Sequence, residues 1–115
     1  FKAKKMAGAD GFVALFRCYK NYHAWIIGGW QNTRSEVMRI KGTVSDHTVS
    51  TGVWYDVRIT VLKDKVEGFI DDIKAWSVDR VSLERYGSQD AFLKGTGVGV
   101  WNTLCKYKDV LILLK

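Results

Sequence analysis

The alternation of apolar and polar residues from Trp54 to Leu62 is the feature that most constrains the fold of this chain. It has the period of two residues that is typical of a β-strand with one buried and one solvated face. No segment shows sustained apolar spacing at the helical period, and the chain has no proline. The sequence therefore predicts an all-β protein. The core residues expected from this pattern are Tyr55, Val57, Ile59, Val61 and, from the C-terminal part of the chain, Val110.

Short strands separated by turn signals are expected along the rest of the chain. They are predicted at residues 11–19, 22–28, 36–41, 66–70, 74–78, 96–101 and 107–114. Residues 63–65 and the pair Asp71-Asp72 are predicted to form hairpin turns, because aspartate tolerates the left-handed backbone that such turns need. Residues 81–92 are less regular and fit a loop or one helical turn. This pattern is typical of an antiparallel sandwich or jelly roll, here a single domain over residues 1–115.

Five tryptophans in 115 residues are an unusual share, and their placement suggests a binding surface. Trp25 and Trp30 flank a glycine pair and are followed by planar amides and a guanidinium, and Trp101-Asn102-Thr103 repeats the pattern near the C-terminus. Indole rings stack on sugar rings, and amides donate and accept hydrogen bonds in a fixed geometry. Both segments are thus predicted to face carbohydrate. The candidate sugar-binding residues are Trp30, Asn32, Trp101, Asn102, Trp25, Arg34, Arg17 and Tyr22.

Each candidate also has a purely structural interpretation. Trp54 and Trp76 are predicted to be packing residues, and Trp25 to be core or the wall of a groove. Asn32 and Asn102 either bond sugar hydroxyls or form turns by bonding nearby backbone.

Trp30 and Trp101 end their predicted strands and are followed by polar, turn-prone residues, so their rings can remain partly exposed and contact a ligand. Arg34, Arg17 and Tyr22 either extend such a site or lie on the solvated face of a sheet.

The sequence argues against several other functions. Glycosidases need two carboxylates at a defined separation, and the acidic residues here are few and lie in unrelated segments. His23 and His47 lack a third ligand or a nucleophile, so no metal site, cofactor or catalytic triad is predicted. The net charge is +6, but the basic residues are scattered along the sequence, which favours a solvated surface over a nucleic-acid partner. No apolar run is long enough for a membrane span.

The cysteines leave two possibilities open. Cys18 and Cys105 are far apart in sequence and match no zinc or redox spacing. They are either two buried free thiols or, if the chain is secreted, one long-range disulfide.

Several short motifs follow one another along the chain. They are Ala7-Gly8-Ala9-Asp10-Gly11-Phe12, Leu15-Phe16-Arg17, Asn21-Tyr22, Gly28-Gly29-Trp30-Gln31-Asn32-Thr33, Gly52-Val53-Trp54-Tyr55-Asp56-Val57, Phe69-Ile70-Asp71, Gly97-Val98-Gly99 and Trp101-Asn102-Thr103. In their order and spacing they resemble the concanavalin A-like sandwich domains attached to bacterial α-L-arabinofuranosidases of glycoside hydrolase family 51 and, more distantly, family-16-like domains of the 3-keto-disaccharide hydrolase type. Asp72 stands where that family usually has a turn glycine.

The resemblance implies an exported, noncatalytic module that binds plant cell-wall polysaccharide such as arabinoxylan, xylan or arabinan, alongside the catalytic domain of a parent enzyme. Two alternatives remain: a structural domain that packs against a catalytic partner, and a small glycoside hydrolase of the same fold. The family usually has strands before the segment that matches Phe1. The chain is therefore expected to lack N-terminal strands of the sandwich and to self-associate through exposed strand edges.

Overall fold

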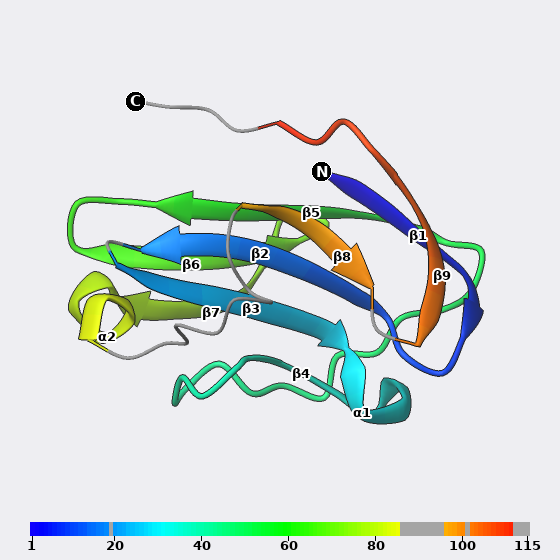
Figure 1. Ribbon diagram of the computed structural model, residues 1–115, viewed down its shortest axis with the longest axis horizontal. Helices are drawn as coiled ribbons and strands as arrows, with labels where there is room; N and C mark the ends of the chain where they lie inside the picture. Colours follow the sequence, from blue (N-terminus) through cyan, green and yellow to red (C-terminus); the bar gives the residue numbers. More distant parts are fainter. Residues whose placement is uncertain (19, 86–95, 101, 112–115) are drawn as a thin grey trace.

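The computed structural model describes residues 1–18, 20–85, 96–100 and 102–111, and its strands form two antiparallel sheets (Figure 1). One sheet has the order β7 (Ile73–Asp79), β6 (Lys65–Ile70), β5 (Trp54–Val61), β1 (Lys2–Gly8), β9 (Thr103–Lys108). The other has the order β4 (Arg34–Val37), β3 (Asn21–Gly28), β2 (Phe12–Cys18), β8 (Gly97–Val100). Two short helical segments accompany them, α1 (Gly29–Asn32) and α2 (Arg80–Arg85). The described part of the chain is thus all-β in character, as the alternating pattern predicts.

The two sheets share one hydrophobic core. Phe12 of the four-stranded sheet packs against Tyr55 of the five-stranded sheet, with ring centroids 5.8 Å apart. Trp25 and Trp76 meet edge to face at 5.4 Å and join the sheets at a second point. Each ring buries a large apolar surface, so these contacts between the sheets hold the sandwich together.

The hairpin between β6 and β7 has the predicted geometry. Asp71 and Asp72 have φ angles of 51° and 63°, which is the left-handed pair expected of a tight two-residue turn. The Asp71 carboxylate also accepts a hydrogen bond of 2.8 Å from the backbone N–H of Asp56. The aspartate in place of the family's turn glycine is therefore compatible with a tight hairpin.

The strands of the structure differ from the predicted strands in three places. Residues Lys2–Gly8 form β1, which was not predicted because Lys4 and Lys5 break the apolar alternation. The strand expected at residues 36–41 is β4, which ends at Val37, because Arg39 turns into the left-handed region at φ 65°. The strand expected at residues 107–114 is β9, which ends at Lys108 before Asp109 with φ 54°. The last three residues of that prediction, 112–114, lie outside the described part of the chain.

The expected core is only partly correct. Val57 is buried, and Tyr55 and Ile59 pack against the core cluster. Val61 and Val110 are both 47% exposed, since each lies at or beyond the end of its strand. Self-association remains a prediction; the strands at the sheet edges are β4, β7, β8 and β9.

The cysteines are free thiols in this structure. Cys18 is buried in β2 and Cys105 half-buried in β9, and burial raises the pKa of each thiol. This agrees with the first of the two interpretations, in which both are unpaired strand residues.

A hydrogen bond of the His23 side chain connects α2 with the inner face of the four-stranded sheet. The Nε2 atom of His23 lies 2.9 Å from the carbonyl oxygen of Leu83, and the Asn21 amide donates to the carbonyl of Glu84 at 2.6 Å. Only 1% of His23 is exposed, and its Nδ1 has no hydrogen-bond partner. Burial therefore lowers the pKa of His23, and the hydrogen bond to Leu83 offsets part of that shift.

This lowered pKa predicts a loss of stability in acid. In the unfolded chain His23 takes up a proton at its ordinary pKa of about 6.5. In the folded protein it takes up that proton only at a lower pH. Stability is therefore complete above the pKa of the unfolded chain and should fall by up to about 1.4 kcal/mol for each pH unit below it, until the folded pKa is reached. Urea unfolding at a series of pH values would measure this slope, and His23→Gln should flatten it. An unchanged slope in that variant would mean that another group is responsible.

Candidate sugar-binding site

A left-handed turn at the end of β3 builds the candidate site. Trp30, Gln31 and Asn32 have φ angles of 49°, 62° and 59°. A left-handed backbone costs a non-glycine residue roughly 1–2 kcal/mol, so three in succession are unusual. Such strain is found most often at functional sites, where the surrounding structure enforces it.

The glycine pair before the turn is required by its geometry. A Cβ atom on Gly28 would lie 2.7 Å from Oδ1 of Asn32, and one on Gly29 would lie 2.4 Å from Cγ2 of Ile26. Gly28 is itself left-handed, with φ 71°. The Gly28-Gly29 pair therefore lets the chain leave β3 in the direction that the turn needs.

Hydrogen bonds from distant segments and one within the turn hold it in place. The Asn32 amide bonds both backbone groups of Val49, accepting at 2.7 Å and donating at 3.0 Å. The backbone N–H of Gln31 donates to Oδ1 of Asp10 at 2.7 Å, and the Thr33 hydroxyl donates to the carbonyl of Trp30 at 2.7 Å. These bonds fix the backbone of the turn that carries Trp30.

Substitutions at Asn32 should separate the hydrogen bonds from the backbone strain. Asn32→Ala loses both bonds to Val49 and keeps a Cβ in the left-handed region, so it should lower the free energy of unfolding by about 2–4 kcal/mol. Asn32→Gly loses the same bonds without that strain and should cost about 1 kcal/mol less. Denaturant unfolding of both variants would measure the difference. Equal and small losses would show that the turn is not held through Asn32.

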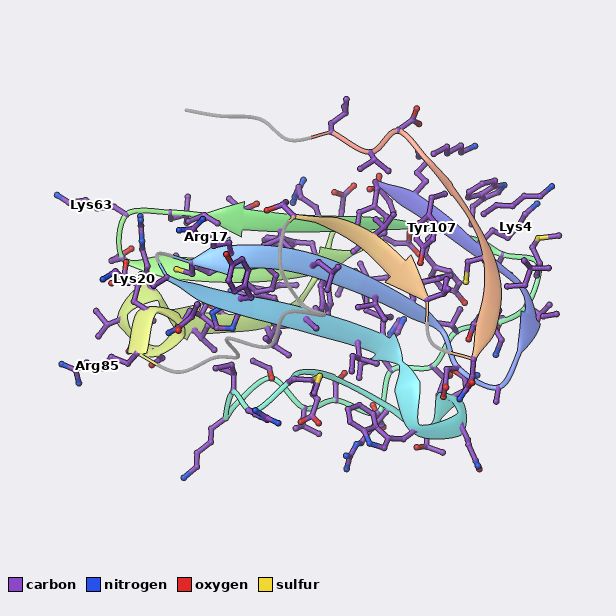
Figure 2. The ribbon with its side chains drawn as sticks, in the orientation of Figure 1. Lys4, Arg17, Lys20, Lys63, Arg85 and Tyr107 are labelled. Carbon is purple, nitrogen blue, oxygen red and sulfur yellow. The ribbon has the colours of Figure 1, made fainter. Side chains whose placement is uncertain are left out.

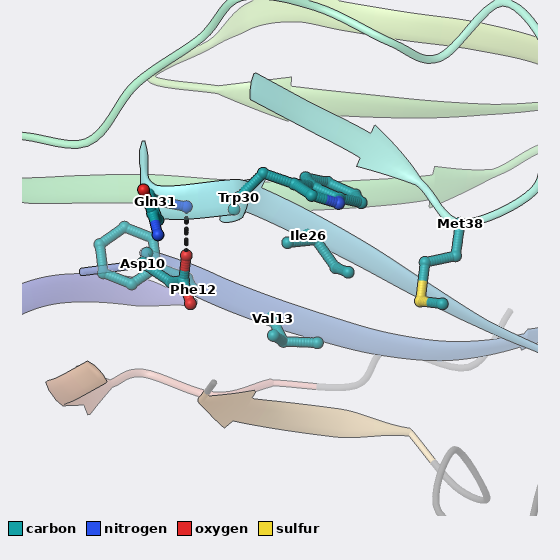
Figure 3. Close-up of a pocket in the computed structure, with 9 residues that line it drawn as sticks. Asp10, Phe12, Val13, Ile26, Trp30, Gln31 and Met38 are labelled. Atoms are coloured by element: carbon teal, nitrogen blue, oxygen red, sulfur yellow. Dashed lines mark hydrogen bonds between the residues drawn. The ribbon is translucent and has the colours of Figure 1, made fainter. Parts of the chain in front are cut away.

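Next to the turn lies a pocket of about 320 Å³ on the outer face of the four-stranded sheet. Figure 3 shows the Trp30 ring on one side, Ile26 and Val13 facing it, Met38 at one end, and Asp10 with Gln31 at the other. Val13 and Ile26 are cross-strand neighbours on β2 and β3, so the sheet itself forms the apolar floor. The pocket combines an apolar surface, an indole and a few polar groups, which is the usual make-up of a small-molecule site.

The guanidinium of Arg34 lies over the indole ring of Trp30. It is 3.9 Å from the centroid of the Trp30 ring and 3.6 Å from the carboxylate of Glu36. Trp30 remains 40% exposed. The cation lies over the ring, and its guanidinium N–H groups are hydrogen-bond donors beside the indole.

Arg17 and Tyr22 lie on the same sheet face but not in this pocket. They form a cross-strand pair of β2 and β3, with the guanidinium 5.6 Å from the Tyr22 ring centroid. Tyr22 and Ile26 are four positions apart on β3, a distance of roughly 13 Å along the strand. Ala24 between them is buried, so the two clusters are separate patches of surface.

The other predicted residues have different positions. Trp25 points to the inner face and is 1% exposed, which makes it a core residue. Asn32 acts as a turn former through Val49, and Asn102 is also left-handed, with its carbonyl 3.1 Å from the Ala9 nitrogen. Trp101 lies outside the described residues. The sequence interpretation did not include Asp10, Val13, Ile26, Gln31 and Met38, because only strand pairing and the left-handed turn bring them together.

Among the described residues, no group of three His, Cys, Asp or Glu side chains is arranged to hold a metal ion. The carboxylates nearest the pocket, Asp10 and Glu36, are bonded to the Gln31 backbone and paired with Arg34. Within the same part of the chain, no helix is long and apolar enough to cross a membrane.

Comparison with known proteins links the chain to part of a glycoside hydrolase. No family model matches it, and no solved structure matches it. The chain is 35% identical, over 78 residues, to the extracellular exo-alpha-L-arabinofuranosidase of Streptomyces chartreusis. The match covers 61% of this chain and spans about a tenth (10%) of that protein's length. The chain is therefore related to a segment of a glycoside hydrolase, within an all-β fold of two antiparallel sheets.

Proposed function

We propose that this chain is a noncatalytic carbohydrate-binding module that binds neutral plant cell-wall polysaccharide at the Trp30 pocket. The observation that carries the proposal is a half-exposed indole, fixed by a strained turn beside an apolar pocket. The similarity to a segment of an arabinofuranosidase supports arabinoxylan, xylan or arabinan as ligand classes. It also supports an extracellular location and a catalytic partner in the same enzyme. In this proposal the sandwich is of the concanavalin A-like jelly-roll type.

The pocket suggests how a sugar would bind. A volume of about 320 Å³ is at the lower end for ligand sites and suits one or two sugar rings. The apolar C–H face of a sugar would stack on the Trp30 ring. Hydroxyls at its edge would meet the side chains of Gln31, Asp10 and Arg34. Such shallow, water-bridged sites bind weakly, with Kd on the order of micromolar to millimolar.

Affinity electrophoresis through gels that contain single polysaccharides tests this proposal. Arabinoxylan, xylan or branched arabinan should retard the protein, whereas starch should not. The retardation should change little when about 0.5 M salt is added, because no ion pair to a neutral sugar is involved. Normal mobility in every gel, from a folded protein, would contradict the proposal and favour the structural-domain alternative. Release of sugar from these polymers by the chain alone would favour the hydrolase alternative.

A further inference from the structure

The outer face of the five-stranded sheet gathers lysines that are scattered in the sequence. Lys4 pairs directly with Lys106 across β1 and β9, and Lys2 pairs with Lys108. On the other side of β1, Lys4 pairs with Trp54 of β5. We call these four lysines and Trp54 the lysine face. The prediction that the basic residues form no cluster is wrong here, because strand pairing joins the two ends of the chain.

Trp54 is the centre of this face rather than a core residue. Its ring is only half-buried, and the ammonium groups of Lys108 and Lys4 lie 4.1 Å and 4.9 Å from its centroid. Its neighbours along β5 show the alternation, since Tyr55 packs into the core and Asp56 is exposed. The alternating strand therefore points Trp54 away from the core, which corrects its prediction as a packing residue.

The ammonium groups of the lysine face repel one another, and this repulsion lowers the stability of the fold. Like charges directly opposite each other on antiparallel strands are destabilising, and here two such pairs are adjacent on one face. One carboxylate, that of Asp56, lies 3.8 Å from Lys2 and offsets part of this charge. An anionic ligand would relieve the rest, so the arrangement is suited to binding one.

We infer that the lysine face binds a carboxylated polysaccharide, one built from uronate sugars. In a uronate the carboxylate is attached directly to the ring, next to an apolar C–H face. That arrangement complements ammonium groups held beside an indole. Single-stranded nucleic acid fits less well, because successive bases stack on several aromatic side chains and the lysine face has one indole, that of Trp54. This inference does not depend on the Trp30 pocket, which lies on the other sheet.

A double charge reversal on β9 tests the inference. Lys106→Glu with Lys108→Glu replaces both like-charge pairs with opposite-charge pairs, so its melting temperature should be equal to or above that of the wild type. The matched control is Lys63→Glu with Arg85→Glu, which changes the net charge equally at the end of the molecule far from Lys4 (Figure 2). The ligands are polygalacturonate, its fully methyl-esterified form and oligothymidylate, at about 0.05 M salt.

The wild type and the control should bind polygalacturonate and not its methyl ester. The β9 variant should bind it about tenfold more weakly or worse, and added salt should weaken the wild type. Trp30→Ala should leave this binding unchanged, which separates it from the pocket. Equal binding of the methyl ester, no binding of polygalacturonate, or an equal loss in the control would overturn the inference. Oligothymidylate binding as tightly as polygalacturonate would overturn it in favour of a nucleic-acid surface.

Discussion

Trp76→Ala should lower the free energy of unfolding by about 3–5 kcal/mol, a large part of the stability of a domain of this size. Trp76 is 4% exposed, meets Trp25 edge to face at 5.4 Å and stacks on Phe16 at 6.1 Å. It thereby connects β7 with both central strands of the other sheet. Its ring also fills the space over Gly68, where a Cβ would come within 2.4 Å of the indole. Alanine would leave a cavity between the sheets.

Two further variants make this a sharp test in urea unfolding experiments. Trp76→Phe should cost less than alanine, because the phenyl ring still fills part of the space between the sheets. It loses no hydrogen bond, since the buried indole N–H has no partner. Trp54→Ala, on the lysine face, should cost no more than about 1.5 kcal/mol, because that ring is only half-buried. If Trp54→Ala proved as costly as Trp76→Ala, the assignment of the two rings to outer face and core would be wrong.

Trp30→Ala should weaken binding to the retarding polysaccharide by about tenfold or more, or about 1.4 kcal/mol, with little effect on stability. The ring is 40% exposed, so few core contacts are lost, while the stacking surface of the pocket disappears. Trp54→Ala is the control for losing an exposed indole elsewhere and should bind neutral polysaccharide normally. Affinity electrophoresis with circular dichroism would measure both properties. Undiminished retardation of a folded Trp30→Ala protein would remove Trp30 from the site.

Local patterns in the sequence predicted the elements that have strong local signals. The alternation in β5, the paired aspartates of the β6–β7 turn and the exposed indole at the end of β3 all have the expected character. In each case neighbouring residues determine the outcome. A strand shows its period, two aspartates tolerate a left-handed turn, and polar residues after Trp30 leave its ring near solvent.

Features that depend on contacts between distant strands have no local signal in the sequence, so they could not be predicted from it. The burial of Trp76 depends on how β7 packs against the other sheet, where its ring meets Trp25 and Phe16. The lysine face joins residues about a hundred positions apart. The pocket needs Asp10 to reach Gln31 and Asn32 to reach Val49, and neither contact has a local signal.

The most direct test of the central claim, that neutral sugars bind at the Trp30 pocket, is an NMR titration with arabinoxylan-derived oligosaccharides. Saturating sugar should shift the indole N–H signal of Trp30, assigned through Trp30→Phe, together with the side-chain amide of Gln31 and the methyl group of Met38. The indole signals of the core residues Trp25 and Trp76 should not move. Shifts confined to Tyr22 and Arg17 or to Trp54, or no shift at about 10 mM sugar, would contradict the account.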